Sequence, residues 1–399
     1  MKQKRVLIVS HALELGGAER SLVGLLWEMN RPDIQVDLFL LRHEGELMDM
    51  IPPHVNLLPE IPTYTVLARP MKDTLKEGHV LLTLARVYGR VKATAFVKRH
   101  HLTENGVAIE YSHKYTYRLM PPIQPGVEYD AVISFLTPHY IAAHKVRAKR
   151  KICWIHTDYS HVAIDTKSEY QMWNQYDYIV AISDAAKNNF ISIFPKRLNK
   201  VHVIENILPR ILIERQAEAG YAGWRRDGEI KLLSVGRFCQ AKNFDNVPDI
   251  CRRIRAVGLP VTWYLIGYGA DEKLIRKKIE ESGMKEYVIV LGKKDNPYPY
   301  IKACDLYVQP SRYEGKCVAV REAQMLGKPV VITDYSTSKS QLEDGLDGII
   351  VPLDNEGCAK GIIELLNVPA RMAELSVACQ KRDYSNREET DKIYQLIED

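Results

Sequence analysis

The feature that most constrains the fold of this chain is a regular alternation of short apolar runs with amphipathic helical segments. Runs rich in Val, Ile and Leu are each followed by a turn and a segment with helical spacing, and this order repeats along most of the 399 residues. Strands that alternate with helices form parallel sheets whose two faces are covered by the helices. The sequence therefore predicts an α/β protein.

The first series of these segments fills the N-terminal half. Residues 4–10 form a short β-branched run that leads through a glycine-containing turn into a helical segment at 18–29, the opening of a Rossmann-like unit. A signal peptide explains this start less well, because the apolar run at 6–9 is shorter than the roughly 7–15 residues of such a peptide's apolar region. Ser183 is expected to cap a helix over 185–194. Further strands are predicted at 36–41, 131–135, 151–155, 178–182 and 200–204.

A second series begins at residue 230. One hydrophobic core rarely extends beyond roughly 250–300 residues, so a chain of this length suits two domains. We place them at residues 1–206 and 207–382, with a polar linker at 210–229 and an amphipathic tail helix within 383–399. The second domain is predicted to have strands at 231–235, 261–266, 288–291, 306–309, 329–333 and 348–351, and helices at 245–256, 273–281, 300–303, 318–326 and 357–366.

Two facing Rossmann-like domains leave an interdomain cleft at the carboxyl ends of their strands, where sheets of this type bind ligands. One loop at such an end carries Gly236, Arg237 and Lys242 after the predicted strand 231–235. Arginine offers a fork that matches phosphate oxygens, and lysine offers a point charge. Because negative charge grows on a departing diphosphate, cations fixed in this loop would stabilise the transition state more than the ground state.

A second loop follows the predicted strand 306–309. It carries Glu314 and Gly315 and leads into a helix that contains Glu322. Carboxylates accept hydrogen bonds from paired hydroxyls, which suits a ribose and a hexose, and the backbone N–H groups at the start of the helix suit a phosphate. The structural alternative is that both glutamates are surface carboxylates paired with Arg237 and Lys242.

Together these loops resemble the retaining glycosyltransferases of the family 4 type, which have the GT-B fold of two facing Rossmann-like domains. The resemblance is strongest from residue 233 to residue 366 and is looser but continuous in the first half. The matching motifs are Glu314-x7-Glu322, Gly236-Arg237-x4-Lys242, Gly16-Gly17-Ala18-Glu19, Gly327-Lys328-Pro329-Val330-Val331 and Asp347-Gly348.

The resemblance implies a role for each matched donor residue. Glu322 would bind the ribose hydroxyls and Glu314 the hydroxyls of the transferred sugar, while Arg237 and Lys242 would hold the diphosphate. Lys294 would lie in the loop that reads the base.

The loop around Glu314 departs from the family pattern. Family members commonly have Glu-Gly-Phe-Gly, whereas this chain has Glu314, Gly315, Lys316 and Cys317, followed by Val318. All of these residues are expected at the donor, so the departure leaves the identity of the transferred sugar open. Lys316 either adds a charge at the donor or points to solvent.

In the first domain, Gly16 and Gly17 would let the backbone approach a phosphate or a sugar closely. The resemblance places His156, after the predicted strand 151–155, near the reacting sugar. There its imidazole would hydrogen-bond a sugar hydroxyl or share charge during departure, and the structural alternative is a histidine that caps a strand end. His156 and Glu314 are the candidate catalytic residues. In the resembling fold, the tail helix packs against the first domain.

Composition and short motifs limit the metals, cofactors and macromolecules that we expect as partners. No Asp-x-Asp motif occurs, so we expect no metal site of the kind used by other sugar transferases, and no cofactor beyond the nucleotide sugar itself. The seven scattered cysteines suggest free thiols in a reducing cytoplasm. A net charge of +5 without a nucleic-acid-binding motif argues against nucleic acid as a partner.

A basic segment at 69–101 suggests a membrane contact. It holds eight Lys and Arg residues against two acidic residues, interleaved with apolar positions, and 145–151 adds five more cations. Such a helix can lie on an anionic membrane at the inner face of the plasma membrane, or it can be a solvated basic face. Tyr111, Tyr115 and Tyr117 are candidates for an acceptor groove.

The sequence thus predicts a hexosyltransferase that uses a nucleotide sugar, with UDP as the favoured carrier, and a glycan or lipid-linked acceptor of capsule or lipopolysaccharide biosynthesis. The alternatives are a nucleotide-sugar epimerase of the same fold and a non-catalytic nucleotide-binding partner of another transferase. The sugar, the base, the linkage and the acceptor are left open.

Overall fold

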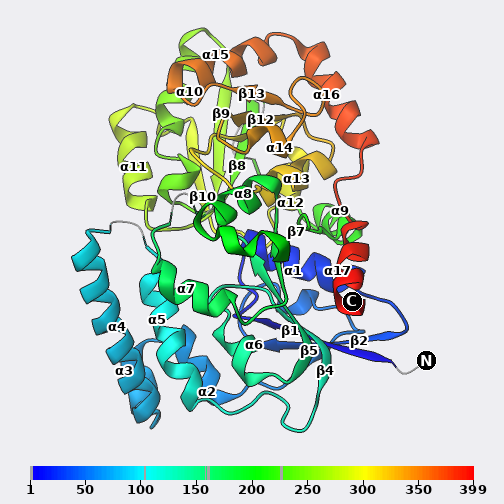
Figure 1. Cartoon of the computed structure of the whole chain (residues 1–399). Coiled ribbons are helices and arrows are strands. Elements are labelled where there is room, and N and C mark those ends of the chain that lie inside the picture. The colour runs from blue at the N-terminus through cyan, green and yellow to red at the C-terminus, as the bar shows by residue number, and fades with distance from the viewer. Residues whose placement is uncertain (1–2, 103–104, 158, 160–161, 225–227) are drawn as a thin grey trace. The chain divides into compact units, whose positions relative to one another are not determined.

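A computed structural model describes residues 3–102, 105–157, 159, 162–224 and 228–399 (Figure 1). The chain forms two compact units, which we call unit 1 (Met1–Ile207 with Arg387–Asp399) and unit 2 (Leu208–Asn386). The sequence had placed the changes of domain after residues 206 and 382. Each unit contains one parallel sheet with helices on its faces, so the predicted α/β architecture is confirmed.

The sheet of unit 1 has seven parallel strands in the order β3-β2-β1-β4-β5-β6-β7. The apolar strand β1 lies inside this sheet, where Val6 pairs with Val36 of β2 on one side and with Ala131 of β4 on the other. The strands are β1 (Lys4–Ser10), β2 (Ile34–Leu40), β3 (Asn56–Leu57), β4 (Tyr129–Ser134), β5 (Ala148–Ile155), β6 (Tyr178–Ala181) and β7 (Val201–Val203).

One helix of unit 1 begins at the cap that the sequence predicts. The expected cap is present, because Ser183 Oγ accepts a hydrogen bond from Ala186 N at 3.1 Å. The helices α4 and α5 lie side by side (Figure 1). The helices are α1 (Gly17–Glu28), α2 (Pro62–Thr65), α3 (Met71–Lys76), α4 (Val80–His100), α5 (Val107–Thr116), α6 (Tyr140–Lys145), α7 (Thr166–Trp173), α8 (Asp184–Ile193) and α17 (Glu389–Glu398).

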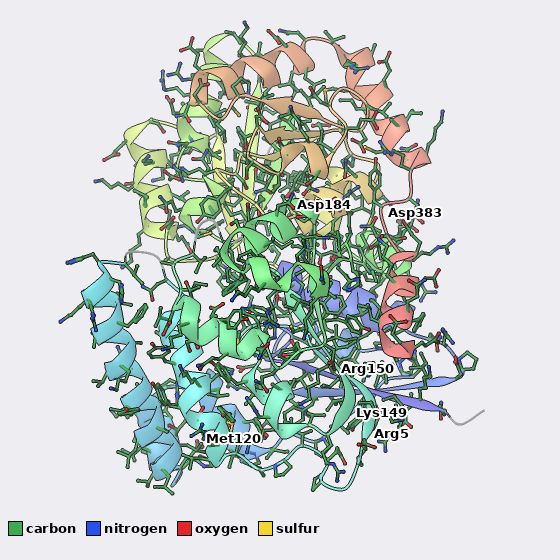
Figure 2. The ribbon with its side chains drawn as sticks, viewed as in Figure 1. Arg5, Met120, Lys149, Arg150, Asp184 and Asp383 are labelled. Carbon is green, nitrogen blue, oxygen red and sulfur yellow. The ribbon has the colours of Figure 1, made fainter. Side chains whose placement is uncertain are left out.

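The last helix, α17, is part of unit 1. Ile393 is fully buried there, and Glu398 forms an ion pair with Arg31 at 3.1 Å. Arg150, at the amino end of β5, donates a hydrogen bond to the carbonyl of Asp399 (Figure 2).

The basic run at 145–151 is largely engaged within unit 1. Lys149 Nζ lies 2.6 Å from Asp130 Oδ1, and Lys151 Nζ donates to the carbonyl of Ala143 at 2.5 Å. These lysines therefore support the amino end of β5, which is their role in the described structure.

The sheet of unit 2 has six parallel strands in the order β10-β9-β8-β11-β12-β13. Strand order reverses between β8 and β11, which pair at Leu232 and Leu306. The strands are β8 (Ile230–Val235), β9 (Val261–Ile266), β10 (Val288–Gly292), β11 (Leu306–Gln309), β12 (Val330–Thr333) and β13 (Ile349–Val351).

Both faces of this sheet are buried, because successive side chains of each strand enter different cores. Leu233 and Tyr307 belong to one cluster, whereas Leu232 and Val308 belong to the other. The helices are α9 (Arg210–Glu218), α10 (Val247–Ala256), α11 (Glu272–Glu281), α12 (Tyr298–Ala303), α13 (Val318–Met325), α14 (Ser338–Gln341), α15 (Asn355–Leu366) and α16 (Pro369–Lys381).

The segment 210–229 departs from expectation, since its first half is the helix α9 rather than a linker; residues 225–227 lie outside the described residues. Ile213 and Ala217, one helical turn apart, are buried in a core of unit 2. The polar residues between them concealed this pair in the sequence.

No helix in the described part of the chain has both the length and the apolar character needed to span a bilayer.

Candidate functional site

The two loops singled out from the sequence lie at the point where the strand order of unit 2 reverses. One follows Val235 at the end of β8, and the other follows Gln309 at the end of β11. Connections from these neighbouring strands leave in opposite directions, which opens space for a ligand at the carboxyl edge of a doubly wound sheet. The fold therefore places residues more than seventy positions apart at one edge.

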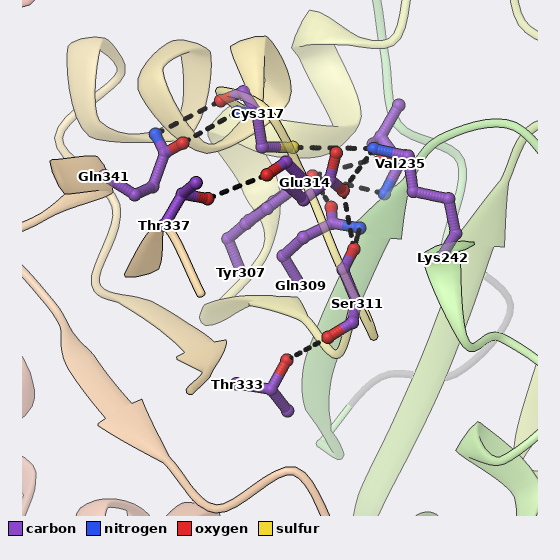
Figure 3. A network of polar contacts seen from close by, with 10 residues as sticks. All are labelled: Val235, Lys242, Tyr307, Gln309, Ser311, Glu314, Cys317, Thr333, Thr337 and Gln341. Carbon is purple, nitrogen blue, oxygen red and sulfur yellow. Dashed lines mark hydrogen bonds and ion pairs between the residues drawn. The ribbon is translucent and has the colours of Figure 1, made fainter. Parts of the chain in front are cut away.

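Lys242, Glu314 and Cys317 meet at this edge (Figure 3). Lys242 Nζ lies 2.5 Å from Glu314 Oε1 and 3.7 Å from Cys317 Sγ. The side chains of the ion pair are only 17% and 11% exposed. Gly236 makes room for the lysine, because a Cβ there would stand 3.3 Å from the Lys242 side chain.

Burial alone would lower the pKa of Lys242, but the charge of Glu314 and its hydrogen bond to the ammonium outweigh burial and raise this pKa, so the ammonium stays charged. Burial, with the neighbouring Glu314, raises the pKa of Cys317 to about 12. The site thus holds one buried cation, one carboxylate and one neutral thiol.

Glu314 is held through one of its two oxygens. Ser311 Oγ donates to Glu314 Oε1 at 2.6 Å, the same atom that contacts Lys242. Glu314 Oε2 receives no hydrogen bond from the described residues. The backbone is fixed as well, because Thr337 Oγ1 donates to the carbonyl of Glu314 at 2.8 Å.

The segment around α14 fastens the start of α13. Cys317 N donates to Gln341 Oε1 at 2.7 Å, and Gln341 Nε2 donates back to the carbonyl of Cys317 at 3.2 Å (Figure 3). Val318 is the first residue of α13. Lys316 Nζ donates to the carbonyl of Ser340 at 2.7 Å, so it turns toward this segment.

Arg237 and Glu322 occupy contrasting environments. Arg237 is exposed and makes no hydrogen bond or ion pair with any residue that the structure describes. Glu322 on α13 is fully buried and accepts a hydrogen bond from Tyr298 Oη at 2.8 Å. The ion-pair alternative raised by the sequence therefore applies to Lys242 and Glu314, whereas Glu322 is no surface carboxylate.

Lys294 follows β10, and its Nζ lies 5.8 Å from the centre of the Tyr300 ring. The loop residue Gly315 is partly exposed beside Glu314. The structure thus joins Lys242, Glu314 and Cys317 directly, whereas Lys294 packs against α12.

Sequence reasoning missed the bridge that ties the two loops together. Arg312 Nη1 and Nη2 lie 2.9 Å from Asp245 Oδ1 and Oδ2, and Arg312 Nη1 also donates to the carbonyl of Gln240 at 2.6 Å. Burial acts to raise the pKa of Asp245, but the hydrogen bonds from Arg312 outweigh it and lower this pKa. No local pattern signals a pair this far apart in the chain.

In unit 1, Gly16 precedes α1 and Gly17 is its first residue. A Cβ at Gly16 would stand 1.9 Å from Glu19 Oε2, so a carboxylate already lies against this helix start. An acidic side chain three positions into a helix commonly caps it in this way.

His156 follows β5, and its ring centre lies 4.7 Å from that of Phe135. Its Nε2 is buried without a partner among the described residues. Burial, partly offset by a hydrogen bond to the Phe135 backbone, lowers the pKa of His156 to about 3, so the imidazole is neutral.

A second buried histidine, His139, was not foreseen. Its Nδ1 lies 2.8 Å from Ser134 Oγ, its Nε2 has no partner among the described residues, and burial lowers its pKa to about 3. Its position after a strand was the available signal.

Known proteins share both sequence and fold with this chain. Residues 223–384 match the family model of glycosyl transferases group 1. The lipopolysaccharide core biosynthesis glycosyltransferase LpsE of Rhizobium meliloti (strain 1021) is 27% identical over 42% of the chain and 49% of its own length. The amylovoran biosynthesis glycosyltransferase AmsK of Erwinia amylovora is 27% identical over 34% of the chain and 35% of its own length. These matches span half or less of each relative.

The whole fold is also found in the crystal structure of HepE from Anabaena in complex with UDP and glucose. That structure has a TM-score of 0.66 and 17% identity, and the match covers 98% of this chain and 100% of that one. The resemblance drawn from Glu314-x7-Glu322 and Gly236-Arg237-x4-Lys242 agrees with the family match, which covers both motifs, whereas Gly16-Gly17-Ala18-Glu19 lies outside it. Residues 223–384 of this chain are thus similar in sequence to the glycosyl transferases group 1.

Proposed function

We propose that this protein is a hexosyltransferase that moves a sugar from a UDP-sugar to a glycan or lipid-linked acceptor in the synthesis of a cell-surface polysaccharide. The observation that carries the proposal is the buried Lys242–Glu314 pair at the switch point of unit 2, beside the exposed Arg237. A cation and a carboxylate side by side suit the two ends of a sugar diphosphate.

Each part of the nucleotide sugar is assigned a contact in this arrangement. Arg237 and Lys242 hold the diphosphate, and the backbone N–H groups at the start of α13 add positive potential. Glu314 contacts the transferred sugar, Glu322 takes the ribose hydroxyls, and the loop at Lys294 contacts the base. Tyr298 supports the ribose contact, because its hydroxyl fixes the Glu322 carboxylate.

In the reaction, the bond between the anomeric carbon and the diphosphate oxygen breaks, and its electron pair leaves with the UDP. The acceptor hydroxyl oxygen forms the new bond to that carbon, and its proton passes to the departing phosphate oxygen. Arg237 and Lys242 stabilise the growing charge without a metal ion. His156 acts as a neutral hydrogen-bond partner of the sugar, and we infer that the anomeric configuration is retained.

The named relatives support this choice of substrates. HepE was crystallised with UDP and glucose, and LpsE and AmsK are named for polysaccharide biosynthesis. The acceptor class of this chain follows from that likeness and from the exposed apolar face of α4.

We also propose that α4 docks unit 1 on an anionic membrane, in a peripheral position on the inner face of the plasma membrane. Leu81, Leu84, Tyr88 and Val91 recur at helical spacing and are 69%, 58%, 50% and 62% exposed. The helix contains no Asp or Glu, and its last turn is basic. Apolar side chains among cations suit the boundary between lipid headgroups and acyl chains.

The test of the donor assignment combines binding and turnover. We expect UDP to raise the melting temperature more than GDP or ADP does, and the protein to release UDP from one of UDP-glucose, UDP-galactose or UDP-N-acetylglucosamine when a saccharide acceptor is present. Release should resist EDTA, and NMR of the product should show a retained anomeric configuration.

Glu314→Gln should lower kcat about a hundredfold while the Kd for UDP changes little, because the carboxylate contacts the sugar and not the nucleotide. Glu364→Gln, a substitution on the exposed face of α15, is the matched control and should leave kcat unchanged. An epimerised sugar nucleotide would contradict the proposal, and so would UDP binding without any turnover, which points to a non-catalytic partner.

A further inference from the structure

We propose that Tyr307, Gln309 and Ser311 form a hydrogen-bond relay that positions Glu314 for the transferred sugar. This inference rests on the proposed function, since it assigns residues that act through the sugar-binding carboxylate. The three residues are positioning residues and do not themselves contact the donor.

The relay follows one side of strand β11 and its continuation. Side chains two positions apart in a strand point to the same face, so Tyr307, Gln309 and Ser311 share one side. Tyr307 Oη lies 2.9 Å from Gln309 Oε1, Gln309 Nε2 lies 2.9 Å from Ser311 Oγ, and Ser311 Oγ lies 2.6 Å from Glu314 Oε1 (Figure 3). All three residues are fully buried.

The direction of each bond is determined by the last acceptor. An ionised carboxylate can only accept, so the single hydroxyl hydrogen of Ser311 must point to Glu314. Ser311 Oγ then accepts from the amide nitrogen of Gln309, which leaves the amide oxygen as the acceptor for Tyr307. At 2.9 Å this oxygen is closer to the Tyr307 hydroxyl than the other acceptor, the carbonyl of Val235 at 3.3 Å. Every donor in the chain therefore points toward the carboxylate.

The relay connects the two loops of the site. At its far end, Val235 N donates to Tyr307 Oη at 3.4 Å, and Val235 is the last residue of β8, directly before Gly236 and Arg237. Hydrogen bonds that point the same way polarise one another and strengthen the terminal bond. The phosphate-binding loop and the sugar-binding carboxylate thus share one buried network.

The consequence for Glu314 is a fixed carboxylate plane. Both Ser311 Oγ and Lys242 Nζ end on Oε1, and the described residues provide no hydrogen bond to Oε2. The relay therefore keeps Oε1 in contact with Ser311 and Lys242, and Oε2 is the oxygen offered to a sugar hydroxyl. A purely structural network would stabilise the sheet but would not affect the sugar step.

Two substitutions of Gln309 separate these roles. Gln309→Met keeps the length of the side chain but ends the relay, so we expect kcat to fall about tenfold to a hundredfold with the Kd for UDP changed less than twofold. Gln309→Glu changes one amide nitrogen to oxygen. When protonated, its hydroxyl donates to Ser311 and its carbonyl accepts from Tyr307, which restores the relay. When ionised, it can only accept, and the relay is broken.

The pH profile is the decisive readout. The titratable groups around position 309 are Tyr307 in direct contact and, across Ser311, Glu314, Lys242 and Cys317. We expect the kcat of Gln309→Glu, divided by that of the unmodified protein, to fall as pH rises from 5.5 to 9, whereas the ratio for Gln309→Met stays flat. The substrate is the UDP-sugar that gives turnover in the donor panel, and UDP affinity is measured by calorimetry.

A kcat for Gln309→Met within twofold of the unmodified protein would refute the relay, as would equal and pH-independent losses in both variants. If position 309 does not tolerate substitution, Tyr307→Phe removes one hydroxyl and should still lower kcat at unchanged UDP affinity. Absence of turnover in the unmodified protein with every UDP-sugar would instead refute the proposed function, and the relay with it.

Discussion

Arg237 and Lys242 are five positions apart and carry the same charge, but their surroundings differ. Lys242 is mostly buried in an ion pair with Glu314, whereas Arg237 is exposed and has no partner among the described residues. Removing one member of a buried pair leaves the other charge uncompensated, which destabilises the fold. Removing an exposed, unpaired charge costs little stability.

We therefore expect Lys242→Met to lower the free energy of unfolding by about 3 kcal/mol, and Arg237→Gln to change it by less than about 0.5 kcal/mol. Arg237→Gln should weaken UDP binding about tenfold through the lost phosphate contact, without weakening uridine, which has no phosphate. Calorimetry with both ligands measures this, and Lys273→Gln on α11 is the control. An equal loss for uridine would show that Arg237 does not contact the phosphates.

Helix α4 has two opposite faces. Leu82, Gly89 and Ala93 are buried against the rest of unit 1, and a Cβ at Gly89 would stand 2.9 Å from the carbonyl of Tyr111, so α4 packs closely on α5. The other face exposes Leu84 and its apolar neighbours. An exposed apolar stripe of this kind marks an interaction surface.

The double substitution Leu84→Ser and Val91→Ser should reduce binding to vesicles of phosphatidylglycerol and phosphatidylethanolamine about tenfold or more, because each removes apolar area that would enter the membrane boundary. Vesicle co-sedimentation measures the effect, and binding should also weaken with added salt. Leu274→Ser, an exposed leucine on α11, is the matched control. If vesicle binding weakens with salt but is unchanged by the two serine substitutions, the contact is purely electrostatic and the apolar face of α4 does not enter the membrane.

The two units differ in their content of histidine. All twelve histidines lie between residues 11 and 202, within unit 1, and the range 208–386 of unit 2 has none. Burial lowers the pKa of His11 to about 4 and that of His139 to about 3, from an ordinary value of 6.5. The folded chain keeps these imidazoles neutral where the unfolded chain protonates them.

Stability from these groups is therefore present above pH 6.5 and is lost as pH falls toward their folded pKa values. For His139 alone, the loss between pH 8 and pH 5 is about 2 kcal/mol. Hydrogen exchange should show β4 and β5 losing protection over this range while β8 and β11 keep theirs. His139→Gln should reduce the slope of the unfolding free energy against pH by the equivalent of about one proton. His100→Gln, an exposed control, should leave this slope unchanged. Equal loss of protection in both units would contradict this origin.

The sequence alone predicted most strands and many of the helices, and it named the candidate site residues. Apolar runs and helical spacing are local properties, so they predicted the strands of both sheets except the two-residue strand β3, and the motif order singled out Lys242 and Glu314 as candidates. The same local signals misjudged α9, where the buried pair Ile213 and Ala217 is hidden among polar residues.

Tertiary structure decided which groups touch. The strand order brings β8 beside β11, and only then can Lys242 reach Glu314 and Arg312 reach Asp245. It also brings β12 beside β11, which lets Gln341 contact Cys317. Hydrogen bonds need partners within about 3 Å and a suitable direction, and neither is encoded by spacing along the chain. Periodicity specifies which face of an element is buried, whereas the pairing of polar groups follows from how the sheet is assembled.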